Sequence, residues 1–181
     1  MNAVRATTVA AALGTGAMGG VFFAFSTFVM RGLARLPASQ GMAAMQSINV
    51  AAVRPGFMTG LFGSAALCVG LGVHALRHRD RAPARLVLAA AAIYLLGTIV
   101  LTIAYHVPRN DALARLVPSD PATAAYWRNY VSAWTSANHV RTASSLAASL
   151  LLVLALVQQG DDRPSDEQRA VGVRRAGFED R

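Results

Sequence analysis

Four long stretches without a charged residue constrain this chain more than any other feature. They cover residues 6–30, 55–76, 86–108 and 142–160, and are 25, 22, 23 and 19 residues long. A helix needs about 20 mainly apolar residues to cross a bilayer. We therefore expect an all-α fold, a four-helix transmembrane bundle. The pattern excludes a soluble globular domain, a disordered chain, a disulfide-rich secreted module and a collagen-like fibre.

The basic residues predict the orientation of this bundle. The formal net charge is +8, from 17 basic residues, all Arg, and 9 acids. The arginines cluster at the ends of the apolar runs, so no soluble basic face remains, and we expect no nucleic-acid partner. The loop 77–85 has four arginines in nine residues. Because Arg-rich loops stay inside, we expect it and both termini to be cytoplasmic, in the inner or plasma membrane.

Two regions follow from this pattern. Residues 1–160 are expected to form an integral membrane domain. Residues 161–181 mix six acids with five arginines, and we expect this tail to be disordered and cytoplasmic because it has little to bury. Within the first two apolar runs, small residues recur at a spacing of four that lets helices pack closely in lipid, either inside one bundle or in a homo-oligomer. These pairs are Gly16 and Gly20, and Gly56 and Gly60.

The segment between the first two runs is too long for a plain turn and has helical spacing from Gly41 to Val50. We expect a short interfacial helix there. One face would carry Met42, Met45, Ile48 and Ala52, and another would carry Gln46 and Asn49.

The fourth helix is predicted to begin before its apolar run. Asp120 can cap it, with Pro121 at the first position. From there to Gln159 the helix would be about 58 Å long, whereas the hydrocarbon core is about 30 Å thick. The N-terminal third of this helix must therefore project outward, lie on the surface or break.

That projecting part holds the polar residues that we take as a candidate site. At about 100° per residue, one side of the helix carries Thr135, Asn138, His139 and Thr142, flanked by Trp134 and Arg141, with Trp127 two turns earlier. Four segments should meet on the same outer side, and the others supply His106, Asn110, Ser26, Gln46 and Asn49. The alternative is that the aromatic residues and Arg141 only anchor the membrane interface.

No metal site is expected here. His106 and His139 are two possible ligands, but only Asp111 accompanies them as a carboxylate. We also expect no cofactor.

Four blocks of sequence, taken together and in order, are characteristic. They are Ser26–Met30 with Leu33–Pro37, Met45–Asn49 with Pro55–Phe57, Val107–Leu113, and Trp134–Thr142. With these blocks the chain resembles, from about residue 8 to 157, the anthrone oxygenase family of small four-helix membrane proteins. One departure is His106, where the family's third block usually has Asn.

The resemblance implies oxidation of an anthrone or a related phenolic polycyclic substrate to a quinone with O2 and without a cofactor. In this hypothesis His139 is the base, since an imidazole exchanges protons near neutral pH. Arg141 and Asn138 would stabilise the developing oxyanion. The substrate would be held by Trp134, Trp127, Gln46, Asn49, His106, Asn110 and Ser26.

The main alternative is a non-catalytic membrane protein that binds a lipid, a quinone or a partner subunit. A proton-coupled transporter is weaker, because no carboxylate lies within any apolar run.

Overall fold

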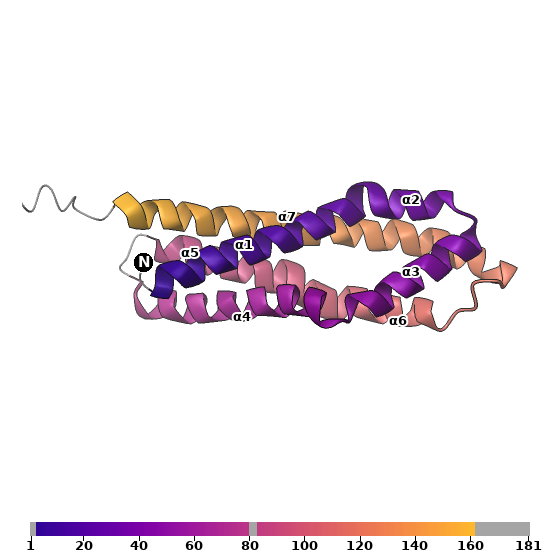
Figure 1. The fold of residues 1–181 in the computed structure, drawn as a ribbon, viewed down its shortest axis with the longest axis horizontal. Helices are drawn as coiled ribbons and strands as arrows, with labels where there is room; N and C mark the ends of the chain where they lie inside the picture. Colours follow the sequence, from indigo (N-terminus) through magenta and orange to yellow (C-terminus); the bar gives the residue numbers. More distant parts are fainter. Residues whose placement is uncertain (1–2, 80–82, 162–181) are drawn as a thin grey trace, which may run out of the picture.

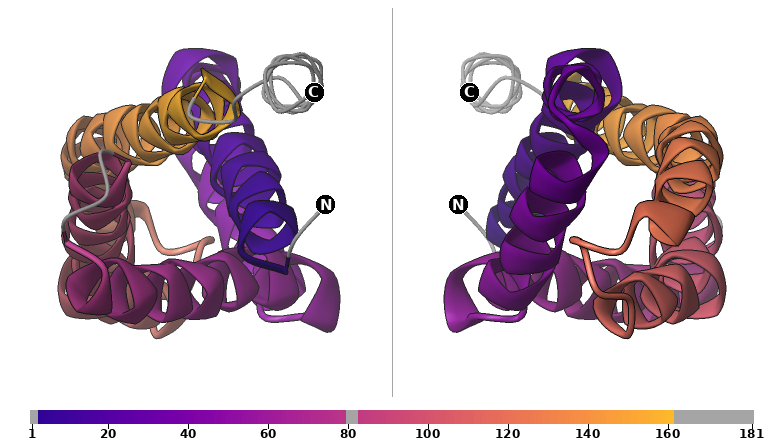
Figure 2. Two further views of the ribbon diagram at one scale, coloured as in Figure 1. Left: turned by 90° about the vertical axis from the view of Figure 1, so that its left-hand side faces the viewer. Right: turned by 90° about the vertical axis from the view of Figure 1, so that its right-hand side faces the viewer.

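The computed structural model describes residues 3–79 and 83–161, with side chains to Gln159, and its described part contains helices and no strand. Four helical stretches are long and apolar enough to cross a membrane: Ala3–Arg35, Pro55–Arg77, Ala84–Ala114 and Pro121–Gln159. They run side by side around a common axis (Figures 1 and 2). The prediction of a four-helix membrane bundle is confirmed, and the chain is an integral membrane protein.

Two of the four spans contain π-helical segments. The first span consists of α1 (Ala3–Ala24), the π-helix η1 (Phe25–Val29) and α2 (Met30–Arg35). The second span is α4 (Pro55–Arg77). The third consists of α5 (Ala84–Tyr94), the π-helices η2 (Leu95–Val100) and η3 (Thr102–His106), and α6 (Val107–Ala114). The fourth consists of the 3₁₀ turn η4 (Pro121–Thr123) and α7 (Ala124–Asp161).

The predicted helix between the first two spans is α3 (Ala38–Ala52), which runs obliquely beside the bundle (Figure 1). Met42 and Met45 on its apolar face are fully buried. Gln46 lies on the polar face of α3, and its Nε2 donates hydrogen bonds to the carbonyl oxygens of Leu113 at 2.9 Å and Leu116 at 3.0 Å. These two carbonyls lie at and just beyond the end of α6, so Gln46 ties α3 to the third span.

The long fourth helix begins as predicted. The Oδ1 of Asp120 accepts a hydrogen bond from the backbone N–H of Ala122 at 2.9 Å, with Pro121 at the first position of the turn. From there α7 continues without a break to Asp161. Its N-terminal third lies beside α2, α3 and α6, and we call this part of the molecule the α3 end (Figure 1).

Buried side chains form separate clusters along the bundle axis. The α3-end cluster consists of Met30, Met42, Met45, Leu113, Trp127, Tyr130 and Trp134. The middle cluster consists of Met18, Phe22 and Leu61. A third cluster, rich in alanine and leucine, fills the opposite end, where α1 begins and α4 ends. The bundle is therefore packed at both ends.

Only one glycine of each predicted pair packs closely inside the bundle. A Cβ at Gly16 would lie 2.9 Å from Ser149 Oγ, and one at Gly60 would lie 3.1 Å from Met18 Sδ, whereas Gly20 and Gly56 have open space around them. The expectation of a disordered tail concerns residues that, after Asp161, lie outside the described part of the chain.

Candidate functional site

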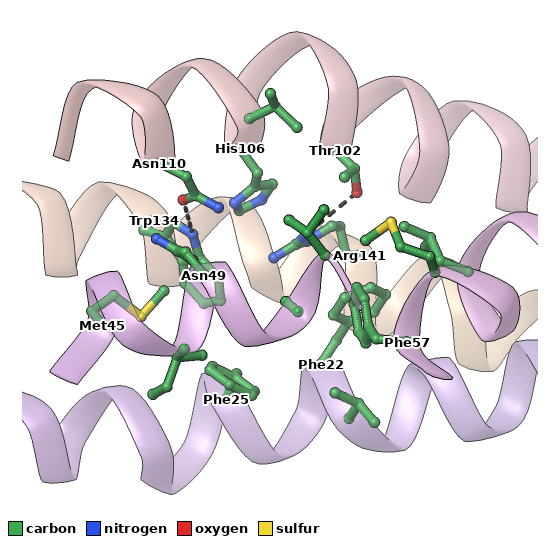
Figure 3. Close-up of a pocket in the computed structure, with 17 residues that line it drawn as sticks. Phe22, Phe25, Met45, Asn49, Phe57, Thr102, His106, Asn110, Trp134 and Arg141 are labelled. Carbon is green, nitrogen blue, oxygen red and sulfur yellow. Dashed lines mark hydrogen bonds between the residues drawn. The ribbon is translucent and has the colours of Figure 1, made fainter. Parts of the chain in front are cut away.

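A pocket of about 170 Å³ lies between the middle cluster and the α3-end cluster (Figure 3). Residues from all four spans and from α3 line it. The polar lining residues are Asn49, Thr102, His106, Asn110 and Arg141, and the aromatic ones are Phe22, Phe25, Phe57 and Trp134. Small-molecule sites have this character, with apolar walls and a few polar groups that point toward one another.

A buried cation forms one wall of the pocket. Arg141 donates from Nε and Nη2 to the Oδ1 of Asn138, at 3.0 and 2.7 Å, and from Nη1 to the Oγ1 of Thr102 at 3.3 Å. Its guanidinium carbon lies 4.4 Å from the ring centre of Phe22 and 5.1 Å from that of Trp134. All these partners are neutral. A buried charge without a counter-charge is costly, so the pocket favours an anionic group beside Arg141.

Asn138 holds this guanidinium in place. Its side chain is fully buried, and its Nδ2 donates to the backbone carbonyl of Phe22 and to Ser26 Oγ, each at 2.7 Å. Ser26 in turn lies 3.4 Å from the hydroxyl of Thr142. Asn138 and Ser26 are thus engaged with the protein and lie behind the pocket, where they position Arg141 and fix α7 against the first span.

The opposite wall holds polar atoms that lack partners. His106 is 1% exposed, and neither of its ring nitrogens makes a hydrogen bond within the described residues. The Nδ2 of Asn49 and the Oγ1 of Thr135 are also buried and unpartnered. Three of these four atoms belong to residues that line the pocket. Such groups are rare in native proteins, and a ligand with polar atoms would satisfy them.

Trp134 connects the two walls. The ring of His106 meets the indole edge to face, with centroids 5.0 Å apart, and Arg141 faces the same indole. The Oδ1 of Asn110 accepts hydrogen bonds from the indole Nε1 at 3.1 Å and from the hydroxyl of Tyr130 at 2.8 Å. Asn110 therefore lines the pocket as predicted, but its oxygen is used to orient Trp134.

The prediction for the position of His139 is wrong. His139 is exposed on the outer side of α7, whereas Trp134, Asn138 and Arg141 face inward. The inward face is centred between Asn138 and Arg141, and His139 lies about 100° beyond Asn138 on the far side. His139 therefore does not reach the pocket or pair with His106.

Two further predicted residues also lie outside the pocket lining. Trp127 is buried in the α3-end cluster, where it packs against α3 at Gly41. Gln46 is engaged with the carbonyls beyond α6. Within the described residues, no three His, Cys, Asp or Glu side chains lie close enough to hold a metal ion.

Several lining residues were not predicted from the sequence. Thr102 is the most informative, because Thr102, His106 and Asn110 follow one another at a spacing of four along the third span. This polar stripe was a readable signal for the wall that it forms. Phe22, Phe25 and Phe57 gave no such signal, since each lies within or beside an apolar run.

The comparison with known protein families matches the part of the chain that supplies most of the polar pocket residues. The model of the family described as anthrone oxygenase matches residues 56–151, slightly more than half of the 181 residues. The match includes His106, Asn138 and Arg141. It begins after α1 and α3, which supply most of the remaining residues of the pocket lining. No curated protein and no solved structure matches the chain. With a family model that covers its second, third and most of its fourth span, the chain belongs to the anthrone oxygenase family.

Proposed function

We propose that the protein oxidises an anthrone-like or related phenolic polycyclic compound to a quinone with O2, without a cofactor. The observation that carries this proposal is the pairing of buried Arg141, which has only neutral partners, with buried His106, whose ring nitrogens are unpartnered, across an aromatic pocket. Family membership supports an oxygenase-like activity. The pocket supplies what an oxygen reaction through a carbanion requires: a proton acceptor, an anion site and a dry aromatic surround.

The first step is removal of a proton from the methylene carbon that lies opposite the ring carbonyl. A neutral imidazole has one lone-pair nitrogen that can take this proton, and we assign that role to His106. The electron pair left on carbon spreads to the carbonyl oxygen, which becomes anionic. Arg141 has five N–H groups and uses three in its hydrogen bonds to Asn138 and Thr102, so two remain for this oxygen.

The second step is the reaction with O2. The carbanion transfers an electron to O2 and the two radicals combine, which forms a C–O bond and reduces the O–O unit to a peroxide that takes the proton back from the imidazole. Removal of the second methylene proton then breaks the O–O bond, forms the C=O bond and releases water. The sum is one methylene and one O2 converted to one carbonyl and one water.

The pocket volume bears on how a substrate would lie. A cavity of about 150 Å³ accommodates benzene, so the 170 Å³ here accommodates one ring and not three. We therefore place the reacting ring between Arg141 and His106, stacked near Trp134, and the other rings toward the opening of the pocket.

Oxygen consumption by the purified protein, with a panel of anthrones and hydroquinones, tests the proposal. We expect uptake of one O2 per anthrone, and His106→Phe, which keeps a flat ring but removes the lone pair, should lower the rate by about 10²–10⁴ if the imidazole is the base. His139→Phe is the matched control and should behave as wild type, because His139 is exposed. Binding of these compounds without oxygen uptake would favour the non-catalytic alternative, and full activity of His106→Phe would remove the imidazole from this role.

The proposal extends to orientation, with both termini in the cytoplasm. It is supported by Arg77 at the end of α4, Arg79 just after it and Arg85 in the first turn of α5, because these helix ends lie at the end of the bundle opposite α3 (Figure 1). Cys68 is the only cysteine, so single cysteines can be placed in a Cys68→Ala background. A membrane-impermeant maleimide added to intact cells should label Ser119→Cys and leave Arg79→Cys unlabelled; the reverse pattern would overturn the orientation.

A further inference from the structure

We infer that the pocket is loaded sideways from the bilayer, through openings on either side of the turn that joins α3 to α4, by a planar molecule dissolved in the membrane. This inference rests on the proposed use of the pocket as a ligand site. It adds a route and a physical class of substrate, neither of which follows from the reaction itself.

The first argument is that both axial routes are filled. Toward the α3 end, the pocket is closed by the α3-end cluster, in which Met45 and Trp134 also form pocket wall. Toward the opposite end, Phe22 and Leu61 of the middle cluster close it, and the ring of Phe22 meets that of Phe57 edge to face at 6.3 Å. A ligand of aromatic size therefore has no path along the bundle axis.

The second argument is that exposed apolar residues form part of the pocket lining. Val53 in the α3–α4 turn is 71% exposed, Val107 at the start of α6 is 44% exposed, and Val21 of α1 is 38% exposed. The same side chains thus contact the pocket and the outer surface of the bundle. They mark two lateral openings, one between the turn and α6 and the other between the turn and α1.

The third argument is helix packing. Along the bundle α3 packs on α2, α6 and α7, and α4 packs on α1, α5 and η2. Met58 at the start of α4 and Val107 at the start of α6 both line the pocket. Within the described residues α4 does not pack extensively on η3 or α6, so few helix contacts close the bundle between the second and third spans at the depth of His106.

The fourth argument is the depth of these openings in the membrane. From Arg54 to Arg77 the second span measures about 34 Å at 1.5 Å per residue, close to the thickness of about 30 Å of the hydrocarbon core. From Arg141 to Gln158 the fourth span measures about 26 Å. The openings therefore lie at the boundary between acyl chains and headgroups, and Arg141 lies just below it. A flat aromatic molecule with one polar edge would concentrate at this boundary, as amphipathic rings do.

Association kinetics of a non-reacting probe test this route. The probe is 1,8-dihydroxyanthraquinone in phosphatidylcholine vesicles that contain the purified protein, followed by its own absorbance. Val53→Trp and Val107→Trp would each fill an opening. The control is Val50→Trp, because Val50 is also 71% exposed on α3 but does not line the pocket.

We expect the double variant Val53→Trp with Val107→Trp to slow association and dissociation together by at least about tenfold, within the one to three decades over which association rates vary. The equilibrium constant should change much less than either rate, because the polar groups that would bind the ligand, such as Arg141 and Asn49, stay in place. Association should follow the mole fraction of the probe in the membrane when the amount of lipid is varied, and Val50→Trp should match wild type.

Unchanged association rates in the double variant, or rates that follow only the aqueous probe concentration, would overturn the inference, as would absence of probe binding by the wild-type protein. The two proposals fail separately. If the wild-type protein consumes oxygen but the double variant associates at the wild-type rate, the lateral route is refuted and the proposed oxygenase activity stands. If the double variant associates slowly but the wild-type protein consumes no oxygen, the lateral route stands and the oxygenase activity is refuted.

Discussion

Replacement of Arg141 by Met should abolish the preference of the pocket for an anionic ligand. The methionine keeps most of the length and apolar stem of the side chain, but it removes the charge and the two N–H groups that remain after the hydrogen bonds to Asn138 and Thr102. Since all partners of the guanidinium are neutral, no other charge in the pocket offsets the loss.

The size of the effect follows from the geometry. A phenolate oxygen in hydrogen-bond contact with a free guanidinium N–H lies about 4 Å from the centre of charge, where two unit charges attract by about 4 kcal/mol at an effective dielectric constant of 20. An opposite charge at this range lowers a pKa by about 1–3. The wild-type pocket should therefore lower the pKa of a bound phenol by that amount, and its affinity for the phenol should rise as the pH increases from the bound pKa to the free pKa.

Spectrophotometric titration of bound 1,8-dihydroxyanthraquinone measures this shift without any turnover. We expect the shift in wild type and its loss in Arg141→Met, together with a fall of about 10²–10³ in the oxidation rate, the cost of removing one oxyanion donor. Arg109→Met is the control, because Arg109 lies over the ring of Tyr105 at 3.5 Å and does not line the pocket. An equal shift in wild type and Arg141→Met would refute the reasoning.

Three further predictions follow from the packing and the proposed chemistry. His106→Phe should leave thermal stability equal to or above that of wild type, because it removes two unpartnered buried nitrogens. Asn138→Ala removes hydrogen-bond partners of Arg141 and should lower the free energy of unfolding by about 2–4 kcal/mol in denaturant titrations. Equal losses of stability in the two variants would contradict the hydrogen-bond assignment. Gly97→Ala should destabilise the bundle by about 1–3 kcal/mol, because its Cβ would lie 2.6 Å from that of Ser144, whereas Gly70→Ala meets open space and should be tolerated; retained stability of Gly97→Ala would contradict the packing. Treatment with a strong chelator should leave oxygen uptake unchanged, because the carbanion reacts with O2 directly, and loss of uptake restored by one metal would contradict this chemistry.

Sequence reasoning predicted the fold because the relevant signals are local. Charge-free runs of bilayer length mark the spans, Asp120 and Pro121 mark the start of the fourth helix, and the methionine face of α3 predicts its buried side. Each of these signals depends on residues that are adjacent in the chain or one helical turn apart. None requires knowledge of which helices are neighbours.

The candidate site was predicted in part, and the error at His139 has a physical cause. Grouping polar residues on the helical wheel placed the centre of the inward face too near Thr135. The true centre of the inward face depends on the neighbouring helices, which cover Trp134 and Arg141. Burial of Arg141 was not expected, because an arginine is rarely buried without a carboxylate beside it. The segments that bring His106 inward are π-helical, and a pattern based on 3.6 residues per turn does not reveal them.

These π-helical turns make the architecture of the chamber depend on residue count as well as on residue identity. Each one accommodates an extra residue, and losing it would rotate everything downstream by about 100° relative to the preceding helix. Deletion of one residue between Leu95 and Leu101 would remove the first of the two π-helical turns and turn the imidazole away from the pocket, with every lining side chain still encoded. Among relatives of this chain, the length of the third span would then be inherited as a determinant of chemistry, and comparisons that score substitutions alone would overlook it.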